Sequence, residues 1–358
     1  MKIGLVRRGY SATGGAERYL GRFAEALKAE GHEAVLFGSR EWPAEAWKGQ
    51  FMRVEGNSPR EFADGLRKAK PREHCDLVFS LERVWECDAY RAGDGVHRAW
   101  LERRRAFEPA WKGWFRATQR KHREILELEA AVFGPEGARL MIANSRLVAR
   151  EIAQHFQTPE QRVRVVYNGL PPSDFRLQTS SPARAEARNR LGLGPECAVL
   201  FAGSGWERKG LRFAMEGVNR TKNAVLLVAG AGKRRGLPPA DGKTRFLGEV
   251  KEMRELMEAA DVFVLPTIYD PFSNASLEAM AAGLPVITTT LNGFSEIMRP
   301  GEDGEALRNP ADVEAIAAGI EKWRQRETPE TRENRRLEAG KYTIERNVRE
   351  TMQALKIV

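Results

Sequence analysis

The sequence of 358 residues has few cysteines and no long hydrophobic segment. Its three cysteines, Cys75, Cys87 and Cys197, are widely spaced and form no CxxC pair, which excludes a disulfide scaffold and indicates a reducing compartment. The longest apolar run, residues 224–232, falls far short of the ~20 residues that span a membrane. Near the N-terminus only residues 3–6 are continuously apolar, too few for a signal peptide. Any membrane contact is therefore expected to be peripheral.

Patterns that bind metal ions are missing as well. The sequence contains no Asp-x-Asp, the usual motif for holding a metal ion against a diphosphate. Its five histidines, at positions 32, 74, 97, 122 and 155, lack the spacing of metal ligands. We therefore expect neither a metal ion nor another bound cofactor.

What the sequence does have is apolar material and an excess of positive charge. Hydrophobic residues make up 42% of the chain, enough for a folded core, and the length predicts two domains of roughly 100–200 residues each. Lysine and arginine number 58 against 49 acidic residues, a net charge of +9. Such an excess points to an anionic partner, with nucleic acid and anionic membrane as the usual candidates.

Both halves of the chain alternate between short apolar runs and helical periodicity. In the first half, strands are predicted at 2–6, 33–37, 77–80 and 140–143, with a helix from about Ala16 to Leu27. After a linker rich in Pro, Ser and Arg at 171–195 the pattern restarts. Strands are then predicted at 198–202, 225–229, 244–247, 262–265 and 286–289, and helices at 250–260 and 275–282. We predict an α/β protein with two doubly wound, Rossmann-like domains, residues 1–168 and 169–342.

Two such domains place a ligand where the carboxyl ends of their strands converge, and three segments carry suitable chemistry there. The first is a glycine turn at 14–18, which lets a phosphate approach the backbone. The second, at 203–210, sets Arg208 and Lys209 beside glycines, as a diphosphate requires. The third contains Asp270 and Glu278, two carboxylates that flank the start of a predicted helix. Each segment by itself is also compatible with an ordinary solvated turn.

Taken together, these motifs resemble those of the retaining glycosyltransferases of family 4, which have the GT-B fold. The resemblance rests on GGAER at 14–18, GSGWERKG at 203–210, PTIYDPFSNASLEAMAAGLPVI at 266–287, and Asn292-Gly293. It covers nearly the whole chain. The carboxylate pair matches the E-x7-E signature of the family, although its first member here is Asp270 instead of glutamate. Within the family the resemblance is to the lipopolysaccharide core glucosyltransferases that add glucose to heptose, on the basis of length, of 208–210, and of Asp94 followed by a long basic insertion.

The resemblance implies roles for individual residues. Arg208 and Lys209 would bind the diphosphate of a nucleotide sugar, and Glu278 would hold its ribose. Asp270 and the backbone N–H groups of Phe272, Ser273 and Asn274 would hold the sugar and a phosphate. Asp94 would lie near the acceptor hydroxyl as a base or a positioning group. Further donor contacts would come from Gly14, Gly15, Gly205, Gly248 and Val250. The C-terminal helix, at about 343–358, would cross back onto the first domain.

Residues 98–123 contain nine lysines or arginines and only two glutamates, so they account for +7 of the net charge. Large aromatic residues lie between these charges, and that composition favours a membrane interface over a solvated helix face. The membrane-binding residues predicted are Arg103, Arg104, Arg105, Trp111, Lys112, Trp114 and Arg116. Nucleic acid is the competing partner, but no helix-turn-helix, zinc-finger or RNP pattern accompanies the basic residues.

The expected function is transfer of a hexose from a nucleotide sugar, UDP-glucose first, to a lipid-linked saccharide such as lipopolysaccharide core heptose. The expected location is the cytoplasmic face of the inner membrane. Alternatives are a family 4 transferase that moves another sugar, for example from GDP-mannose to a soluble acceptor, and a nucleotide-sugar epimerase of the same fold. A non-catalytic sensor of nucleotide sugars would not need a cation such as Lys209 to relieve leaving-group charge.

Overall fold

The computed structural model describes all residues except 11–14, 109–118, 172–180, 251 and 357–358. The chain divides into two compact units, Met1–Asn168 with Ile344–Val358, and Gly169–Thr343. In each unit the described strands form one sheet with parallel pairing throughout. The predicted α/β fold with two Rossmann-like domains is confirmed.

The first unit has the strand order β3-β2-β1-β4-β5-β6-β7. Its strands are β1 Lys2–Arg7, β2 Glu33–Gly38, β3 Gln50–Arg53, β4 Leu77–Ser80, β5 Ala89–Ala92, β6 Leu140–Ala143 and β7 Val163–Val165. Its described α-helices are α1 Gly15–Ala29, α2 Pro59–Lys68, α3 His97–Arg105, α5 Arg120–Phe133, α6 Arg146–Phe156 and α14 Ile344–Leu355. The chain order reverses between β1 and β4, and in open α/β sheets such a switch point is where ligands bind.

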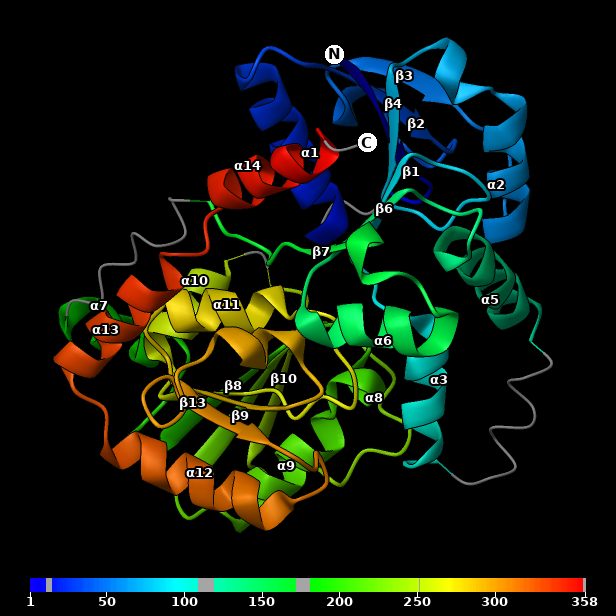
Figure 1. Ribbon diagram of the computed structural model, residues 1–358. Helices are drawn as coiled ribbons and strands as arrows, with labels where there is room; N and C mark the ends of the chain where they lie inside the picture. The colour runs from blue at the N-terminus through cyan, green and yellow to red at the C-terminus, as the bar shows by residue number, and fades with distance from the viewer. Residues whose placement is uncertain (11–14, 109–118, 172–180, 251, 357–358) are drawn as a thin grey trace. The chain divides into compact units, whose positions relative to one another are not determined.

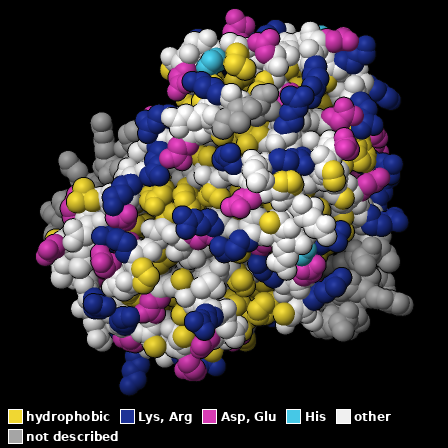
Figure 2. Space-filling view, in the orientation of Figure 1, with side chains coloured by type: hydrophobic (Ala, Val, Ile, Leu, Met, Phe, Trp, Pro, Cys, Tyr) yellow, Lys and Arg dark blue, Asp and Glu magenta, His cyan; other side chains and the backbone are white. Residues whose placement is uncertain are grey.

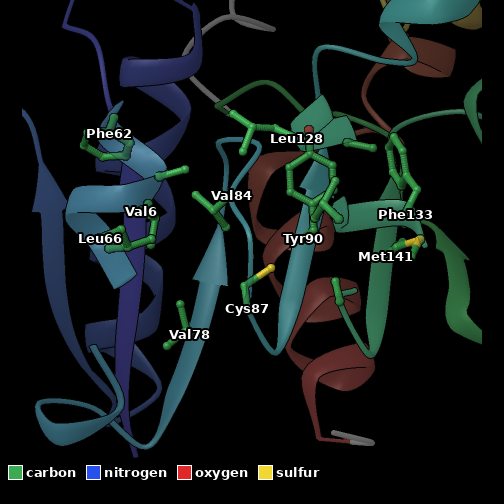
Figure 3. Close-up of a cluster of buried hydrophobic side chains, with 14 of the residues drawn as sticks. Val6, Phe62, Leu66, Val78, Val84, Cys87, Tyr90, Leu128, Phe133 and Met141 are labelled. Atoms are coloured by element: carbon green, nitrogen blue, oxygen red, sulfur yellow. The ribbon is translucent and has the colours of Figure 1, made fainter. Parts of the chain in front are cut away.

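Alternate side chains of β1 point to opposite faces of this sheet, and on each face they pack into a separate hydrophobic core. Val6 packs with Phe62, Leu128 and Phe133 from helices α2 and α5, in the cluster drawn in Figure 3. Leu5 packs in the other cluster, which α1 and α14 complete. Both faces are therefore covered, as a parallel sheet requires.

Helix α14 closes the first unit although it comes last in the chain. Its buried residues Ile344, Val348, Met352 and Leu355 recur at helical spacing and form an apolar stripe. In Figure 1 this helix, in red, lies beside α1, in blue, and the two are in contact. The C-terminal helix thus belongs to the unit that contains the N-terminus.

The second unit has the strand order β10-β9-β8-β11-β12-β13, which repeats the order of the first six strands of the other sheet. Its strands are β8 Cys197–Ala202, β9 Ala224–Ala229, β10 Thr244–Gly248, β11 Val262–Val264, β12 Val286–Thr289 and β13 Gly304–Leu307. Its described α-helices are α7 Ser181–Arg190, α8 Trp206–Lys209, α9 Leu211–Arg220, α10 Met253–Ala259, α11 Asn274–Ala281, α12 Val313–Gln325 and α13 Pro329–Ala339.

Helices cover both faces of the second sheet. Helices α9 and α12 lie together on one face, while α10 and α11 lie on the other (Figure 1). The strands β8 and β9 are buried along their whole length. Their continuous apolar sequences, which made them easy to predict, follow from this burial on both sides. The switch point of this sheet lies between β8 and β11.

Candidate active site

The segment after β8 can turn sharply because glycines occupy its strained positions. Gly203 and Gly205 have φ values of +140° and +73°, a region that other residues rarely adopt. At Gly210, with φ +74°, a Cβ atom would lie 1.9 Å from the carbonyl oxygen of Pro266, so no side chain fits there. These turns bring the short helix α8, which contains Arg208 and Lys209, against the segment that follows β11.

Arg208 is tied to that segment through its backbone and its side chain. Its carbonyl oxygen accepts hydrogen bonds from the backbone N–H of Ile268 (2.9 Å) and from the hydroxyl of Thr267 (2.8 Å). Its guanidinium Nη1 donates to the carbonyl oxygen of Tyr269 at 3.0 Å. The Arg208 side chain nevertheless stays 34% exposed, so the rest of its donor fork can reach a ligand.

Lys209 and Asp270 form a buried ion pair at the same place. The Lys209 Nζ lies 2.5 Å from the Asp270 carboxylate, and Arg208 Nη1 lies 3.7 Å from that carboxylate. Only 11% of the Lys209 side chain and 6% of the Asp270 side chain are exposed. An ammonium group has three donors, so two remain for a ligand after the bond to Asp270.

The two partners of this pair respond to burial in opposite ways. Burial raises the pKa of the Asp270 carboxyl, but the charges of Lys209 and Arg208 outweigh it and hold this pKa below its usual range. Burial lowers the pKa of Lys209 below its usual range, against the opposing pull of Asp270. Asp270 is therefore ionised at neutral pH, and its first task is to hold the Lys209 ammonium in place.

At the start of helix α11, more of the backbone N–H groups form hydrogen bonds within the protein than the sequence predicted. Ser273 caps the helix by accepting a hydrogen bond from the Ser276 N–H at 3.2 Å. The Ser273 N–H donates to Asn292 Oδ1 at 3.2 Å, and the Phe272 N–H donates to the Asp270 carboxylate. The N–H groups of Phe272 and Ser273 therefore have partners within the protein, and the predicted contacts of Phe272, Ser273 and Asn274 with a ligand stay a prediction.

Asn292 organises this loop from its interior. It is fully buried, and its Oδ1 also accepts a hydrogen bond from the Phe294 N–H at 3.1 Å, while its Nδ2 donates to Thr288 Oγ1 at 2.9 Å. The Asp270 N–H and carbonyl pair with Leu291 and Gly293 on either side of it. Asn292 thus positions the loop that carries Asp270, and this role was not predicted from the sequence.

The second unit contains three further donor-site candidates, Glu278, Gly248 and Val250. Glu278 is half-buried on α11, and its negative charge raises the pKa of Lys209, so the two groups interact electrostatically. Gly248 ends β10 with φ +71°, is exposed, and accepts a hydrogen bond from the Gly230 N–H at 2.6 Å. Val250 is half-buried two residues later.

The first unit has its own cluster of charged residues at the switch point of its sheet. Asp94, with 61% of its side chain exposed, lies 3.9 Å from Arg7 Nη1. Arg7 also pairs with Glu17 at 3.2 Å and with Glu82 at 2.9 Å. Burial raises the pKa of Glu82, although Arg7 opposes this shift. Arg7 and Glu82 were not predicted, because 75 positions separate them and only the ends of β1 and β4 bring them together.

A second network fixes the turn that carries Asp94. Glu129 on α5 is fully buried and accepts hydrogen bonds from the backbone N–H groups of His97 (2.6 Å) and Arg98 (3.0 Å) at the start of α3. Arg83 pairs with Glu129 at 3.2 Å and donates to the Gly95 carbonyl at 2.7 Å. The backbone that directly follows Asp94 is therefore held in place.

The predicted glycine turn and membrane segment lie only partly within the described residues. Gly15 begins α1, whereas Gly14, Trp111, Lys112, Trp114 and Arg116 lie outside them. Helix α3 contains the other three predicted membrane residues. Arg103 pairs with Glu151, and Arg104 pairs with Glu108 at 2.6 Å and packs over the Trp100 ring. Arg105 is exposed.

Arg103 and Arg104 therefore have carboxylate partners within their own unit, and the predicted membrane contact of the three arginines stays a prediction. Figure 2 shows lysine and arginine side chains spread over the visible face, with aspartate and glutamate among them. No helix among the described residues is sufficiently long and apolar to cross a bilayer. Within the same residues no three or more His, Cys, Asp or Glu side chains gather as metal ligands would.

Comparison with protein families gives two matches. The model described as Glycosyltransferase Family 4 matches residues 13–174, and the model described as Glycosyl transferases group 1 matches residues 196–325. Together these matches cover most of both units, including the segments that contain Asp94, Lys209 and Glu278.

Individual relatives agree with the families. An uncharacterized glycosyltransferase of Methanocaldococcus jannaschii is 32% identical over 195 residues, which are 51% of this chain and 50% of that protein, so the match spans about half of each. The lipopolysaccharide glucosyltransferase WaaG of Escherichia coli is 23% identical over 86% of this chain and 85% of its own length.

Solved structures show the same fold. The crystal structure of WaaG superimposes with a TM-score of 0.81 at 21% identity and covers 99% of both chains. The crystal structure of Anabaena HepE in complex with UDP-glucose superimposes with a TM-score of 0.73 at 17% identity and covers 100% of both chains.

Proposed function

Because the chain belongs to the family 4 glycosyltransferases, we propose that it transfers glucose from UDP-glucose to a lipid-linked saccharide such as lipopolysaccharide core heptose. The observation that carries this proposal is the buried Lys209–Asp270 pair beside Arg208, at the carboxyl end of β8. It places two cations where a parallel sheet binds its ligand. The names of two similar proteins, a lipopolysaccharide glucosyltransferase and a protein crystallised with UDP-glucose, favour this donor and this acceptor class.

The leaving diphosphate is the group that these cations serve. As the bond between sugar and phosphate breaks, negative charge builds up on the diphosphate, and preorganised cations stabilise that charge most in a site shielded from water. Arg208 supplies planar paired donors and Lys209 a compact charge. Asp270 holds the Lys209 ammonium before the donor arrives, so little reorganisation is needed during the reaction. With two cations in place, we propose that transfer requires no divalent metal ion.

Glu278 holds the ribose of the nucleotide in this proposal. Glu278 is half-buried on α11, and its carboxylate is close enough to influence Lys209 electrostatically. This is expected if the two residues bind neighbouring parts of one nucleotide sugar, Lys209 the diphosphate and Glu278 the ribose. A carboxylate can accept both ribose hydroxyls at once. Gly248 and Val250 at the end of β10 contribute backbone contacts to the base.

The first unit receives the acceptor. Asp94 is exposed at the switch point of its sheet. Arg7 pairs with both Asp94 and Glu82, and in this way it orients the Asp94 carboxylate. We propose that Asp94 positions the acceptor hydroxyl for attack on the same face of the sugar from which the diphosphate departs, so that the anomeric configuration is retained. The basic segment at 98–123 brings a lipid-linked acceptor to this unit by associating peripherally with an anionic membrane.

Release of free nucleotide and transfer of labelled sugar test the function together. UDP-glucose, UDP-galactose and GDP-mannose should be incubated with truncated lipopolysaccharide acceptors or with soluble saccharides, with and without EDTA. The proposal predicts transfer from UDP-glucose to the lipid acceptor, an α-linked product by NMR, and no loss of rate with EDTA. Transfer from GDP-mannose only, or conversion of the donor sugar to its epimer without transfer, would contradict it.

A further inference from the structure

An arginine lies on an inner strand of the first sheet, where apolar side chains are the rule. Strand β5 runs between β4 and β6, and it contains Arg91. Only 7% of Arg91 is exposed, and its neighbour Tyr90 packs in the hydrophobic cluster drawn in Figure 3. Arginine is almost never buried to this extent unless its charge is paired. A cation at this place in the sheet is therefore costly unless an anion balances it.

The described partners of Arg91 are two neutral groups. Its Nη2 donates a hydrogen bond to Asn168 Oδ1 at 2.7 Å, and its Cζ lies 3.7 Å from the centre of the Tyr19 ring. Arg83, another largely buried arginine of this unit, instead pairs with the Glu129 carboxylate. Within the described part of the chain, no carboxylate forms such an ion pair with Arg91, so its charge is not balanced there.

Three parts of the first unit hold the Arg91 side chain in place. Tyr19 on α1 stacks on the guanidinium, and its hydroxyl donates to Asn347 Oδ1 on α14 at 3.0 Å. Asn347 in turn donates to the carbonyl oxygen of Tyr167 at 2.6 Å, directly before the Asn168 that binds Arg91. Ordering a long side chain has an entropic cost, and here that cost is met before any ligand binds. Arg91 is thus preorganised.

The guanidinium of Arg91 points toward the edge of the sheet at which parallel sheets bind ligands. Strand β5 ends at Ala92, and a Cβ atom on Gly93 would lie only 2.9 Å from Arg91 Nη1, so the side chain reaches the first residue after the strand. Arg91 Nε and Nη1 form no hydrogen bond to the described residues, yet neither is a fully buried nitrogen without a partner. Both can therefore be reached from the surface, and their N–H groups remain for a ligand.

We propose that Arg91 binds an oxyanion of the acceptor, a phosphate or a carboxylate, and so selects acidic saccharides over neutral ones. The inference rests on the proposed function, in which the first unit receives the acceptor at Asp94. Arg91 and Asp94 flank Gly93 in one turn, so a group close to the reacting hydroxyl lies within reach of Arg91. A neutral hydroxyl would leave the buried charge unbalanced. An oxyanion balances it and accepts two parallel hydrogen bonds from the guanidinium.

Transfer of glucose to three forms of one truncated lipopolysaccharide tests the inference. The forms are untreated, dephosphorylated, and with the carboxyl groups reduced to alcohols. In the wild type, removal of the recognised group should lower kcat/KM for the acceptor by about tenfold or more, as for loss of a charge-assisted hydrogen bond. A fall with the dephosphorylated form identifies a phosphate, and a fall with the reduced form identifies a carboxylate.

Three variants connect this preference to Arg91. In Arg91→Gln the preference for the acidic form should disappear, and in Arg91→Lys, which keeps the charge but not the paired donors, part of it should remain. Arg53→Gln makes the same charge change at the exposed carboxyl end of the edge strand β3 and should retain the full preference. Circular dichroism shows whether each variant is folded. A lower melting temperature of Arg91→Gln with an unchanged preference would make Arg91 a purely structural residue and overturn the inference.

Two binding measurements separate this inference from its alternatives. Calorimetry should give the same affinity for UDP-glucose in the wild type and in Arg91→Gln, and loss of donor binding would assign the anion to the donor and contradict the inference. Surface plasmon resonance without donor measures binding of the three acceptor forms. A preference that Arg91→Gln abolishes, without transfer to any form, would support the oxyanion site and reject only the proposed transfer. The inference is wrong if the wild type binds all three forms equally or binds none of them.

Discussion

Among single residues, Lys209 has two roles. Lys209 neutralises Asp270 in the folded protein, and in the proposed reaction it meets the charge of the departing diphosphate. Burial lowers its pKa, and the charge of the neighbouring Asp270 carboxylate opposes this shift. A group that acts on charge developing in the transition state affects turnover more than binding.

Lys209→Ala should therefore lower kcat by about 100-fold or more, with a smaller rise in the KM for the donor. Steady-state kinetics with varied UDP-glucose would measure both constants. Lys222→Ala, at an exposed turn of the same unit, is the matched control and should change neither. If KM alone rose in the Lys209 variant, this lysine would be a ground-state binding group and its proposed role would be wrong.

Residues at strand ends were predictable, and residues paired across the fold were not. Arg208, Lys209 and Asp270 lie in the segments that follow the apolar strands β8 and β11, so their position near the sheet edge could be inferred. The pairing of Lys209 with Asp270 spans 61 positions, and that of Arg7 with Glu82 spans 75. Nothing in the local sequence marks such contacts, because strand order alone brings them together.

Among the strands, burial likewise explains which ones the sequence predicted and which ones it did not. The predicted bounds of β4, β6 and β12 agree with the structure, because these strands are short, wholly buried and apolar. Strand β5, with the sequence AYRA, was missed since it contains Arg91, which is buried through a hydrogen bond to Asn168 and stacking on Tyr19. The edge strands β3 and β7 and the strand β13 were missed because their residues are only partly buried.

Helix α14 depends on a buried amide to hold it on the first unit. Asn347 is 1% exposed, accepts from the Tyr19 hydroxyl at 3.0 Å and donates to the Tyr167 carbonyl at 2.6 Å. Asn347→Ala should lower the free energy of unfolding by about 2–3 kcal/mol, because both partners are left without their hydrogen bond. Urea unfolding would measure it, with Gln353→Ala on the exposed face of α14 as control. Equal stability of the two variants would exclude an anchoring role for this amide.

A histidine pair joins α3 to α5 and makes that contact sensitive to acid. His97 Nε2 lies 2.9 Å from His122 Nδ1, and the two rings stack. Burial, together with Arg83, His122, Lys121 and Arg104, lowers the pKa of His97 to about 3. His97 therefore stays neutral in the folded protein at a pH where the unfolded chain, with a pKa near 6.5, takes up a proton.

Stability should consequently fall as the pH drops below about 6.5, and His97 should contribute about 1–2 kcal/mol of that loss by pH 5. Thermal and urea unfolding between pH 7.5 and about 5 would measure the loss in wild type and in His97→Asn. The variant should lose less stability over this interval than the wild type. A pH dependence that His97→Asn leaves unchanged would contradict the low pKa.

In the whole molecule, +7 of the net charge of +9 lies within residues 98–123. Arg103 and Arg104 are paired with carboxylates of their own unit, so the other cations of 98–123 give the cleaner test of membrane binding. Each lysine or arginine near an anionic surface contributes about 1 kcal/mol, and a few suffice for reversible binding.

Changing Arg105, Lys112 and Arg116 to glutamine should therefore reduce co-sedimentation with vesicles that contain anionic lipid. The reduction should vanish at high salt and with neutral lipid, where electrostatic attraction is absent. The matched control changes Arg220, Lys322 and Arg324 of the second unit, which removes the same charge from a surface far from the basic segment in the chain. Equal sedimentation of the two triple variants would remove the main support for a lipid-linked acceptor.

In the proposed function, the second unit holds a nucleotide sugar through Glu278 beside the Lys209–Asp270 pair. The most direct measurement is calorimetric titration of UDP-glucose into the wild type and into Glu278→Gln, with Glu314→Gln on α12 as the control that removes a carboxylate elsewhere in that unit. The account predicts binding at one site, weakened in Glu278→Gln by about 1.5–3 kcal/mol and unchanged in the control, because a charged acceptor to the ribose is lost. Equal affinity of wild type and Glu278→Gln for UDP-glucose would contradict it.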